Sequence, residues 1–405
     1  MLKFKDFIDV TLREGQQSPL LFDTFTYRFS LNDKKQILKA LIELGISHFE
    51  FFSPVVSDTE RSDFLRLKNY IRSISPRKIF LLAHCRCNLN DILEALKYGF
   101  DGLNLYMGIS KSSQEVYGKN KKEIINLIKD TITFVRKRFQ SVYLRFSIED
   151  GFRTSLKDIF IVYDQIAKYV DTLGLPDTTG IATPKDVKKR IRLLRKRYPK
   201  LNVECHFHND RGYSMINAMT AIEEGIEYLD SSIWGLGERS GISSITGVLL
   251  NLYYIHKDIE KKYKIELCYP LNVLMGSILN MQVPYTEPIS LTNRTHIAGV
   301  HQDAILKNKE KYEAHPLEKF GVTSRQLLLG PLSGWHQIYY YLKEIKNFKI
   351  DEEVAKEITQ IFKRKMGTVK NKKPEDVLEE VIKNYSFTKI ELPPQELKRR
   401  IEKLD

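Results

Sequence analysis

The chain has 405 residues, of which 42% are apolar and 28% charged, the ordinary mixture of a globular protein of roughly one to three domains. Its 64 basic and 51 acidic residues give a net charge of +13, but the basic runs are scattered along helical segments and aromatic residues do not interleave with them. This distribution argues against nucleic acid or a membrane surface as a partner, and no apolar run approaches the roughly 20 residues of a membrane span.

Short apolar runs alternate with amphipathic helical stretches through about the first 260 residues. Eight strands are predicted, at residues 7–11, 47–51, 79–83, 102–106, 142–147, 170–175, 203–207 and 228–232. Helices are predicted between them, at residues 32–44, 89–98, 121–139, 156–168, 184–198, 213–224 and 242–262. Eight such units predict a parallel (β/α)8 TIM barrel. A doubly wound sheet is the alternative, but no Gly-x-Gly-x-x-Gly follows the first strand.

After the eighth unit the alternation stops, and the remaining chain has a helical pattern with polar connections, including helices at residues 351–366 and 374–384. We therefore expect a catalytic barrel over residues 1–265, a mostly helical accessory or lid region over 266–385, and a surface tail over 386–405.

The four cysteines, Cys85, Cys87, Cys205 and Cys268, are too few and too widely spaced for a disulfide framework, and we expect reduced thiols. The first residues lack the charged, apolar and small-residue regions of a secretory signal. Both observations favour a cytoplasmic location.

Polar, chemically capable residues follow the predicted strands. They include Arg13, Glu14, Glu50, His84, Arg86, residues 145–149, Asp177, Thr178, His206 and His208. The carboxyl ends of barrel strands converge at one rim, which is where the active sites of such barrels lie. A structural core would not segregate its polar groups in this way.

His206 and His208 are two residues apart on the predicted seventh strand, so both imidazoles lie on the same face. A single histidine on an apolar strand is more often a hydrogen-bonded core residue, but two side by side require a shared partner. A divalent cation meets that requirement, with Glu14 as the third ligand. Two imidazoles and a carboxylate suit Mg²⁺, Mn²⁺ or Zn²⁺, and the sequence does not choose between them.

Several motifs together are specific to one family. They are Asp9–Gly15, Ser53–Val55, His84–Cys87, Arg145–Asp150, Glu204–Asp210, Gly235–Gly241, and Thr295–His301 with Tyr312–Glu313 downstream. On these residues the chain resembles the homocitrate synthases, which are metal-dependent acyltransferases that catalyse a Claisen condensation and are related to isopropylmalate and citramalate synthases.

The resemblance implies that Glu14, His206 and His208 hold the metal, which polarises the carbonyl of a 2-oxo acid. Arg13 would donate to the same oxygen as it becomes an alkoxide. The co-substrate would be acetyl-CoA, which must lose a methyl proton to a base.

For that base the resemblance nominates His301 with Tyr312, reaching the site from a neighbouring subunit, with Glu149 as an alternative or a partner. A homodimer with exchanged C-terminal elements is therefore expected.

Substrate choice is expected to depend on His84, Arg145, Ser147 and Thr178, which offer cationic and hydroxyl donors to a second carboxylate. This favours 2-oxoglutarate as the substrate, homocitrate as the product and lysine biosynthesis as the pathway. Gln17 and Glu50 are assigned to the same substrate site. In one departure from the family pattern, Asn104 stands where an aspartate is expected, so that position carries no negative charge.

Other members of the superfamily are the nearest alternatives. Another 2-oxo acid would give isopropylmalate, citramalate or Re-type citrate synthase activity. An acyl-CoA lyase would lack the patch at Thr295–His301, and a biotin-dependent carboxyltransferase would need a carbamylated lysine that no strand end supplies. The glycine-rich loop Gly235–Gly241 is expected to approach CoA or to brace the metal site, with Glu238 and Arg239 forming an ion pair.

Overall fold

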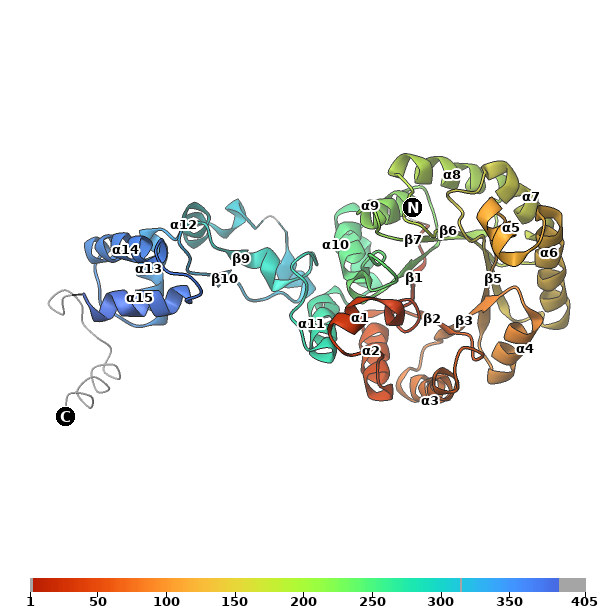
Figure 1. Cartoon of the computed structure of the whole chain (residues 1–405), viewed down its shortest axis with the longest axis horizontal. Coiled ribbons are helices and arrows are strands. Elements are labelled where there is room, and N and C mark those ends of the chain that lie inside the picture. Colours follow the sequence, from red (N-terminus) through yellow and green to blue (C-terminus); the bar gives the residue numbers. More distant parts are fainter. Residues whose placement is uncertain (1–2, 314, 386–405) are drawn as a thin grey trace. The chain divides into compact units, whose positions relative to one another are not determined.

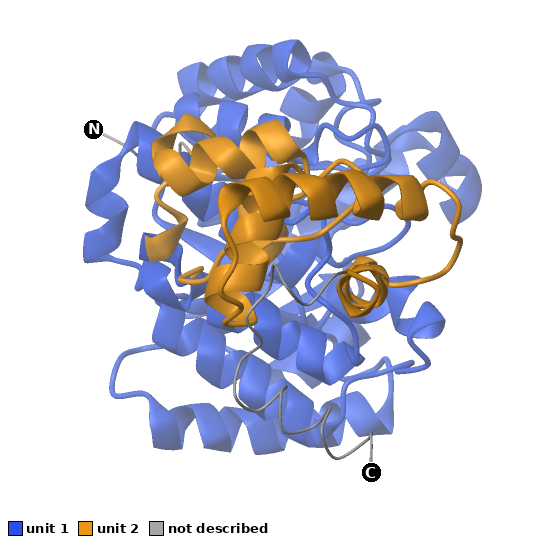
Figure 2. Ribbon diagram, turned by 90° about the vertical axis from the view of Figure 1, so that its left-hand side faces the viewer, with its two compact units in different colours: residues 1–290, 319–321 blue, residues 291–318, 322–405 orange. Residues whose placement is uncertain are grey.

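The computed structural model describes residues 3–313 and 315–385. It comprises two compact units (Figures 1 and 2), of which unit 1 takes residues 1–290 and 319–321 and unit 2 takes 291–318 and 322–405. The surface tail expected over 386–405 lies outside the described residues. Unit 1 extends beyond the expected limit at residue 265 because helix α11 (Cys268–Leu279) packs on helix α2 (Leu31–Leu44).

Unit 1 is a closed barrel of eight parallel strands, which confirms the predicted TIM barrel and excludes the doubly wound sheet. The strands pair in sequence order, and β8 closes on β1. They are β1 (Asp6–Asp9), β2 (His48–Phe52), β3 (Phe80–Arg86), β4 (Gly102–Tyr106), β5 (Tyr143–Ser147), β6 (Thr172–Asp177), β7 (Asn202–Phe207) and β8 (Tyr228–Ser231).

The helices of the barrel surround these strands (Figure 1). Besides α2 and α11 they are α1 (Leu20–Asp23), α3 (Asp58–Ile74), α4 (Leu89–Tyr98), α5 (Lys111–Tyr117), α6 (Lys121–Arg138), α7 (Leu156–Ile166), α8 (Pro184–Arg197), α9 (Ser214–Glu223) and α10 (Ile245–Ile255). Polar N-cap residues determine where several of these helices begin. Capping boxes formed by Ser30 with Asp33, Asn120 with Glu123 and Thr183 with Asp186 begin α2, α6 and α8.

The barrel helices differ from the sequence prediction in two ways: the short α1 and α5 and the long α3 are missing from it, and one helix has the wrong extent. The predictions do not include α3, whose buried apolar stripe is narrow, with Phe64, Leu67 and Ile71 beside a buried aspartate, Asp63. The single helix predicted over 242–262 is wrong in its extent, because α10 ends at Ile255 and a 3-10 helix, η3 (Lys257–Lys261), follows it.

The barrel interior changes from apolar to charged along its axis. A buried cluster of Ile8, Val10, Leu82, Tyr228 and Ile242 fills one region. Further along the strands, alternate side chains are charged or polar, as on β7, where Glu204 and His206 lie on one face of the strand and Cys205 and Phe207 on the other. Polar groups therefore concentrate toward the carboxyl ends of the strands.

Unit 2 contains a two-stranded parallel sheet, formed by β9 (Thr295–His296) and β10 (Gln326–Leu327). Its helices are α12 (Gly299–Lys307), α13 (Trp335–Tyr340), α14 (Glu352–Met366) and α15 (Pro374–Lys383). The last three pack around a core that includes Ile338, Ile358, Phe362, Val377 and Leu378. Among the described residues, no helix is long and apolar enough to cross a membrane.

At the start of β1, the Asp6 carboxylate joins three parts of the barrel. It accepts hydrogen bonds from Ser47 at 2.5 Å and Tyr263 at 2.9 Å, and it lies 3.0 Å from both His48 Nδ1 and Lys262 Nζ. Burial alone would raise the pKa of Asp6, but the hydrogen bond to His48 and the charge of Lys262 outweigh it and lower the pKa to about 2.

Because the folded pKa of Asp6 lies below the ordinary 3.8, its ionised form stabilises the fold above about pH 4, and this contribution is lost as the pH falls toward 2. We expect Asp6→Asn to lower the free energy of unfolding by about 2 kcal/mol at pH 7 and by less at pH 3. Urea denaturation followed by circular dichroism measures both values. The exposed Asp130→Asn serves as the control, and an equal loss for Asp6→Asn at both pH values would contradict the assignment.

Candidate metal centre and active site

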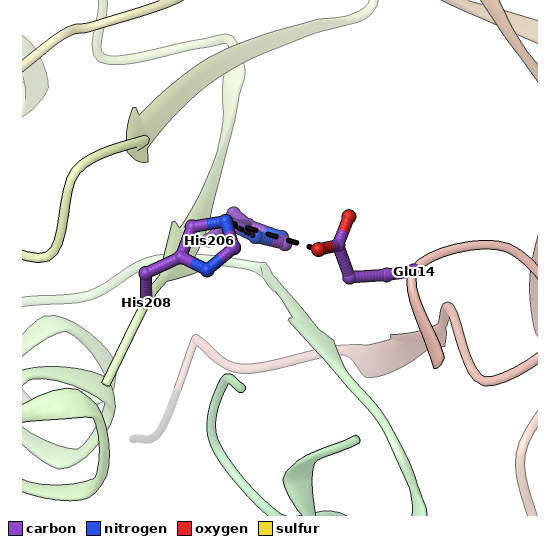
Figure 3. Close-up of side chains that lie close together, drawn as sticks. All are labelled: Glu14, His206 and His208. Carbon is purple, nitrogen blue, oxygen red and sulfur yellow. Dashed lines mark hydrogen bonds and ion pairs between the residues drawn. The ribbon is translucent and has the colours of Figure 1, made fainter. Parts of the chain in front are cut away.

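Three buried side chains from β7 and the segment after β1 converge at the barrel mouth (Figure 3). One ligand atom from each of Glu14, His206 and His208 lies within 4.8 Å of the other two. The two histidine Nε2 atoms are 3.2 Å apart, and His208 Nε2 lies 3.9 Å from Glu14 Oε1. The sequence predicted these three residues as one ligand set, and the structure brings them together.

The local fold accounts for this convergence. The strand alternation turns His206 inward, and His208 continues that face just beyond the end of β7. Glu14 is held by the backbone N–H of Glu238, which donates to its Oε1 at 3.0 Å. A Cβ atom at Gly237 would lie 3.1 Å from Glu14 Cγ, so this position favours glycine. The glycine-rich loop therefore braces Glu14.

The prediction of an ion pair between Glu238 and Arg239 is wrong. Arg239 has a positive φ of 55° and directs its guanidinium to Asp210, with Nε 2.7 Å from the carboxylate, and to the carbonyl of Thr178. Glu238 contributes its backbone to the site. Arg239 therefore pairs with Asp210 in place of Glu238.

The charge states of the cluster suit a cation. Burial and the neighbouring His206 lower the pKa of His208 to about 3, so its imidazole is neutral. Burial acts to raise the pKa of Glu14, but Arg13 and the two histidines lower it to about 2, so its carboxylate is ionised. His206 Nδ1 lies 3.3 Å from Asp230, which leaves Nε2 facing the cluster. Two imidazole nitrogens and one anionic oxygen fit a divalent metal.

Next to the cluster, two arginines and three carboxylates, one of them Glu14 itself, form a buried ion network. The Arg13 guanidinium pairs with both Glu14 and Glu50, and its Nη2 is 2.8 Å from Glu50. Arg145 donates to Glu50 at 2.5 Å and to Asp230 at 2.8 Å. The charges of Arg145 and Arg13 hold the pKa of Glu50 well below its ordinary value although burial acts in the opposite direction.

This network encloses Arg145, which was expected to bind the substrate. Its side chain is 0% exposed, and both terminal nitrogens of its guanidinium have carboxylate partners in the protein. Glu50 is equally enclosed. Neither residue lines the cavity, and they contact residues that do, Glu50 through Arg13 and Arg145 through Asp230.

His84 and Asn104 form the adjoining wall of the site. His84 stacks on Tyr106 with ring centroids 4.3 Å apart, and its Nδ1 lies 3.1 Å from Glu50. Burial and the charge of Arg13 lower the pKa of His84, so its imidazole is neutral. Asn104 donates to Glu50 at 2.9 Å and accepts from Ser147 at 3.0 Å. The Asn104 side-chain amide thus forms hydrogen bonds with both Glu50 and Ser147 without adding a charge to the site.

A cavity of about 250 Å³ opens over the metal cluster. Its walls include the predicted residues Arg13, Glu14, His84, Ser147, Glu149, Thr178, His206 and His208. Gln17 instead lines an adjoining cavity of about 440 Å³, which also contains Arg13 and His84.

Tyr106 and Asp230 belong to the site although the sequence analysis did not select them. Tyr106 lies at the end of β4 and Asp230 within β8, and both line the cavity. The sequence could have indicated Asp230, because an aspartate inside a predicted barrel strand requires a buried partner. Its partners, His206 and Arg145, come from two other strands.

His301 and Tyr312 lie in unit 2, where their rings stack with centroids 4.0 Å apart. Both are exposed. Beside them, Glu313 pairs with Arg294, Arg325 and His296, at 3.0, 2.6 and 3.2 Å. Burial acts to raise the pKa of Glu313, but hydrogen bonds from Arg325 and His296 lower it to about 2, so an ionised carboxylate anchors this segment.

Two family models match the chain. The one described as HMGL-like matches residues 5–270, and the one described as homocitrate synthase post-HMGL domain-like matches residues 291–370. The first match covers the barrel and the second falls within unit 2.

Among solved structures, the HMG-CoA lyase of Bacillus subtilis is 20% identical, with a TM-score of 0.59 over 70% of this chain and 96% of that chain. This similarity concerns the barrel fold alone.

Similar curated proteins cover nearly the whole chain. The cytosolic isozyme of homocitrate synthase from Saccharomyces cerevisiae is 33% identical over 93% of this chain and 85% of its own length. The mitochondrial homocitrate synthase of Schizosaccharomyces pombe is 34% identical over 93% and 87%. The 2-isopropylmalate synthase of Bacillus pumilus is 30% identical over 88% and 69%. The chain therefore belongs to the HMGL-like family and, within it, to the homocitrate synthases.

Proposed function

We propose that this protein condenses acetyl-CoA with 2-oxoglutarate to give homocitrate and CoA. The observation that carries the proposal is the cluster of Glu14, His206 and His208 in a polar cavity at the barrel mouth, in a chain that is 33% identical to a homocitrate synthase over 93% of its length. The methyl carbon of the acetyl group loses a proton and forms a bond to the keto carbon, and water then cleaves the thioester.

Glu14, His206 and His208 would hold a divalent metal, Mg²⁺, Mn²⁺ or Zn²⁺, which acts as a Lewis acid on the 2-oxo acid when it is bound. Arg13 lines the same cavity and is fixed by Glu14 and Glu50, so its guanidinium is available to the keto oxygen as negative charge develops there. A preorganised charge of this kind stabilises the transition state more than the ground state.

The rest of the cavity favours a substrate with a second carboxylate. Thr178 presents a hydroxyl and His84 a neutral imidazole as hydrogen-bond donors, and the Ser147 hydroxyl, which donates to Asn104, adds an acceptor. The aliphatic branch of an apolar 2-oxo acid would leave these polar groups without a partner from the substrate.

Removal of the methyl proton has two candidate bases. Glu149 lines the cavity and accepts a hydrogen bond from Tyr117 at 2.9 Å. The stacked pair of His301 and Tyr312 in unit 2 would serve if it reached the barrel of a second copy, which makes the active form a homodimer with exchanged C-terminal elements.

For the location we propose the cytoplasm, in common with the cytosolic isozyme of Saccharomyces cerevisiae, although other relatives are named mitochondrial.

We expect 2-oxoglutarate to give the highest kcat/KM with acetyl-CoA in a panel that includes 2-oxoisovalerate, pyruvate and oxaloacetate. The donors around the cavity pair with its second carboxylate, and the loss of such a partner costs about 10⁴-fold in specificity at sites built for it. Release of the CoA thiol measures the rates. A preference for 2-oxoisovalerate would assign isopropylmalate synthase activity instead.

We expect His206→Ala to lose metal and turnover together, because the variant leaves only two of the three ligands. Metal content after dialysis, measured by mass spectrometry, tests this together with thiol release. His256→Ala, which removes a histidine beyond the end of α10, is the matched control, and this variant is expected to keep its metal content and its turnover. Full activity of a metal-stripped wild-type sample would refute the metal assignment.

Arg13→Lys is expected to lower kcat by about 100-fold while KM for the 2-oxo acid changes less, because an ammonium group cannot pair with Glu14 and Glu50 and also face the substrate. Steady-state kinetics at saturating acetyl-CoA separate the two constants. An unchanged kcat would remove Arg13 from the transition state.

A further inference from the structure

The Glu149 carboxylate, one of the two candidate bases, is fixed through one of its two oxygens. Tyr117 donates its hydroxyl proton to Glu149 Oε2 at 2.9 Å. Within residues 3–313 and 315–385, no hydrogen bond to the other oxygen, Oε1, is found. The carboxylate is therefore held from one side and keeps Oε1 available for a substrate.

The close approach of Glu149 to the end of β4 depends on Gly108, two residues beyond that strand. A Cβ atom at Gly108 would lie 3.1 Å from Glu149 Oε2 and would overlap Ser113 Oγ on α5. Glycine at this position thus lets both the carboxylate and α5 pack against the same backbone. Glu149 Oε2 is confined between Gly108 and Tyr117.

Helix α5 sets the position of Tyr117, which is its last residue. Ser110 caps the start of the helix by accepting a hydrogen bond from the backbone N–H of Ser113, and Gly118 ends it with a positive φ of 59°. A short helix with a defined start and end restricts where its last side chain can lie. The local sequence therefore fixes the tyrosine that fixes Glu149.

Tyr117 is a donor in this pair and not a second base. Burial and then the charge of Glu149 raise the pKa of Tyr117, so its hydroxyl keeps its proton. Tyr117 lines a cavity of about 540 Å³ beside the metal cavity, whereas Glu149 lines both cavities. Tyr117 therefore reaches Glu149 from outside the metal cavity.

We propose that Tyr117 is a positioning residue that orients Glu149 for removal of the methyl proton. The inference rests on the proposed use of acetyl-CoA and selects Glu149 from the two candidate bases. A base must hold a lone pair within hydrogen-bond reach of the carbon that it deprotonates, and a carboxylate that is already oriented loses less freedom in the transition state. The hydrogen bond on Oε2 supplies this restraint and leaves Oε1 to take the proton.

Removal of the hydroxyl tests the restraint. We expect Tyr117→Phe to lower kcat by about tenfold, as for the loss of one hydrogen bond to a charged group, while KM for acetyl-CoA and for the 2-oxo acid stays within about twofold. With acetyl-CoA deuterated on its methyl group, the isotope effect on kcat is expected to rise, because proton removal becomes slower relative to the other steps. Release of the CoA thiol measures these constants.

Tyr98→Phe is the matched control. Tyr98 is also half-buried and also ends a helix, α4, directly before a glycine with a positive φ, but it lines none of the three cavities at the barrel mouth. This variant is expected to keep kcat and both KM values. An unchanged kcat for Tyr117→Phe overturns the proposal, and a higher KM for acetyl-CoA in that case would assign Tyr117 to ligand binding.

A double-mutant cycle shows whether Tyr117 acts through Glu149. Glu149→Gln is expected to lower kcat by about 100-fold or more, because the amide cannot accept the proton. Adding Tyr117→Phe to Glu149→Gln is expected to change kcat by less than about twofold, since the group that Tyr117 positions is already lost. Losses that multiply would give Tyr117 an independent role and overturn the proposal. A fully active Glu149→Gln would also overturn it, in favour of the pair in unit 2.

Two choices separate this inference from the proposed function. The cycle is run with whichever 2-oxo acid gives the highest rate, so a substrate other than 2-oxoglutarate leaves it intact. A fluorine label needs no turnover, because fluorotyrosine placed at position 117 is expected to change its fluorine resonance on Glu149→Gln. An unchanged resonance shows that the hydrogen bond is absent in solution, and it overturns the proposal even if homocitrate is formed.

Discussion

The pairing of Glu50 with two arginines is the interaction on which the site depends. Arg13, from the segment after β1, and Arg145, from β5, approach the same buried carboxylate. Burying any one of these charges alone would cost several kcal/mol, so Glu50 is held by both arginines and offsets the charge of each. Through Arg13 the network fixes Glu14, and through Arg145 it fixes Asp230, which orients His206. The three candidate metal ligands are thus positioned by charges from four strands or strand ends.

Strand alternation explains how much of the site the sequence could predict. His206 and His208 share a face for the same reason that Cys205 and Phe207 are buried on the other side, and this follows from residue spacing alone. The eight strands were found because their apolar runs recur between amphipathic helices. The strongest features of the sequence are therefore local periodicities.

What the sequence could not predict depends on partners from distant strands. Arg145 was assigned to substrate because a charged side chain on a strand indicates a function, but the sequence does not say whether its partner is a ligand or another residue. Asp230 and Tyr106 were missed because only the closed barrel brings them to the metal cavity. Helix α3 escaped notice because its Asp63, paired with Lys34 on α2, interrupts the apolar stripe.

The balance of charge at the barrel mouth explains why the ligand set calls for a cation. Two guanidinium groups, of Arg13 and Arg145, face three ionised carboxylates, of Glu14, Glu50 and Asp230. Burial raises the pKa of Glu204 well above its ordinary value, so that side chain is neutral, and His208 is neutral as well. These two guanidinium groups and three carboxylates together carry one net negative charge. A divalent cation beside them would change that sum to one net positive charge, which would attract an anionic 2-oxo acid into the cavity.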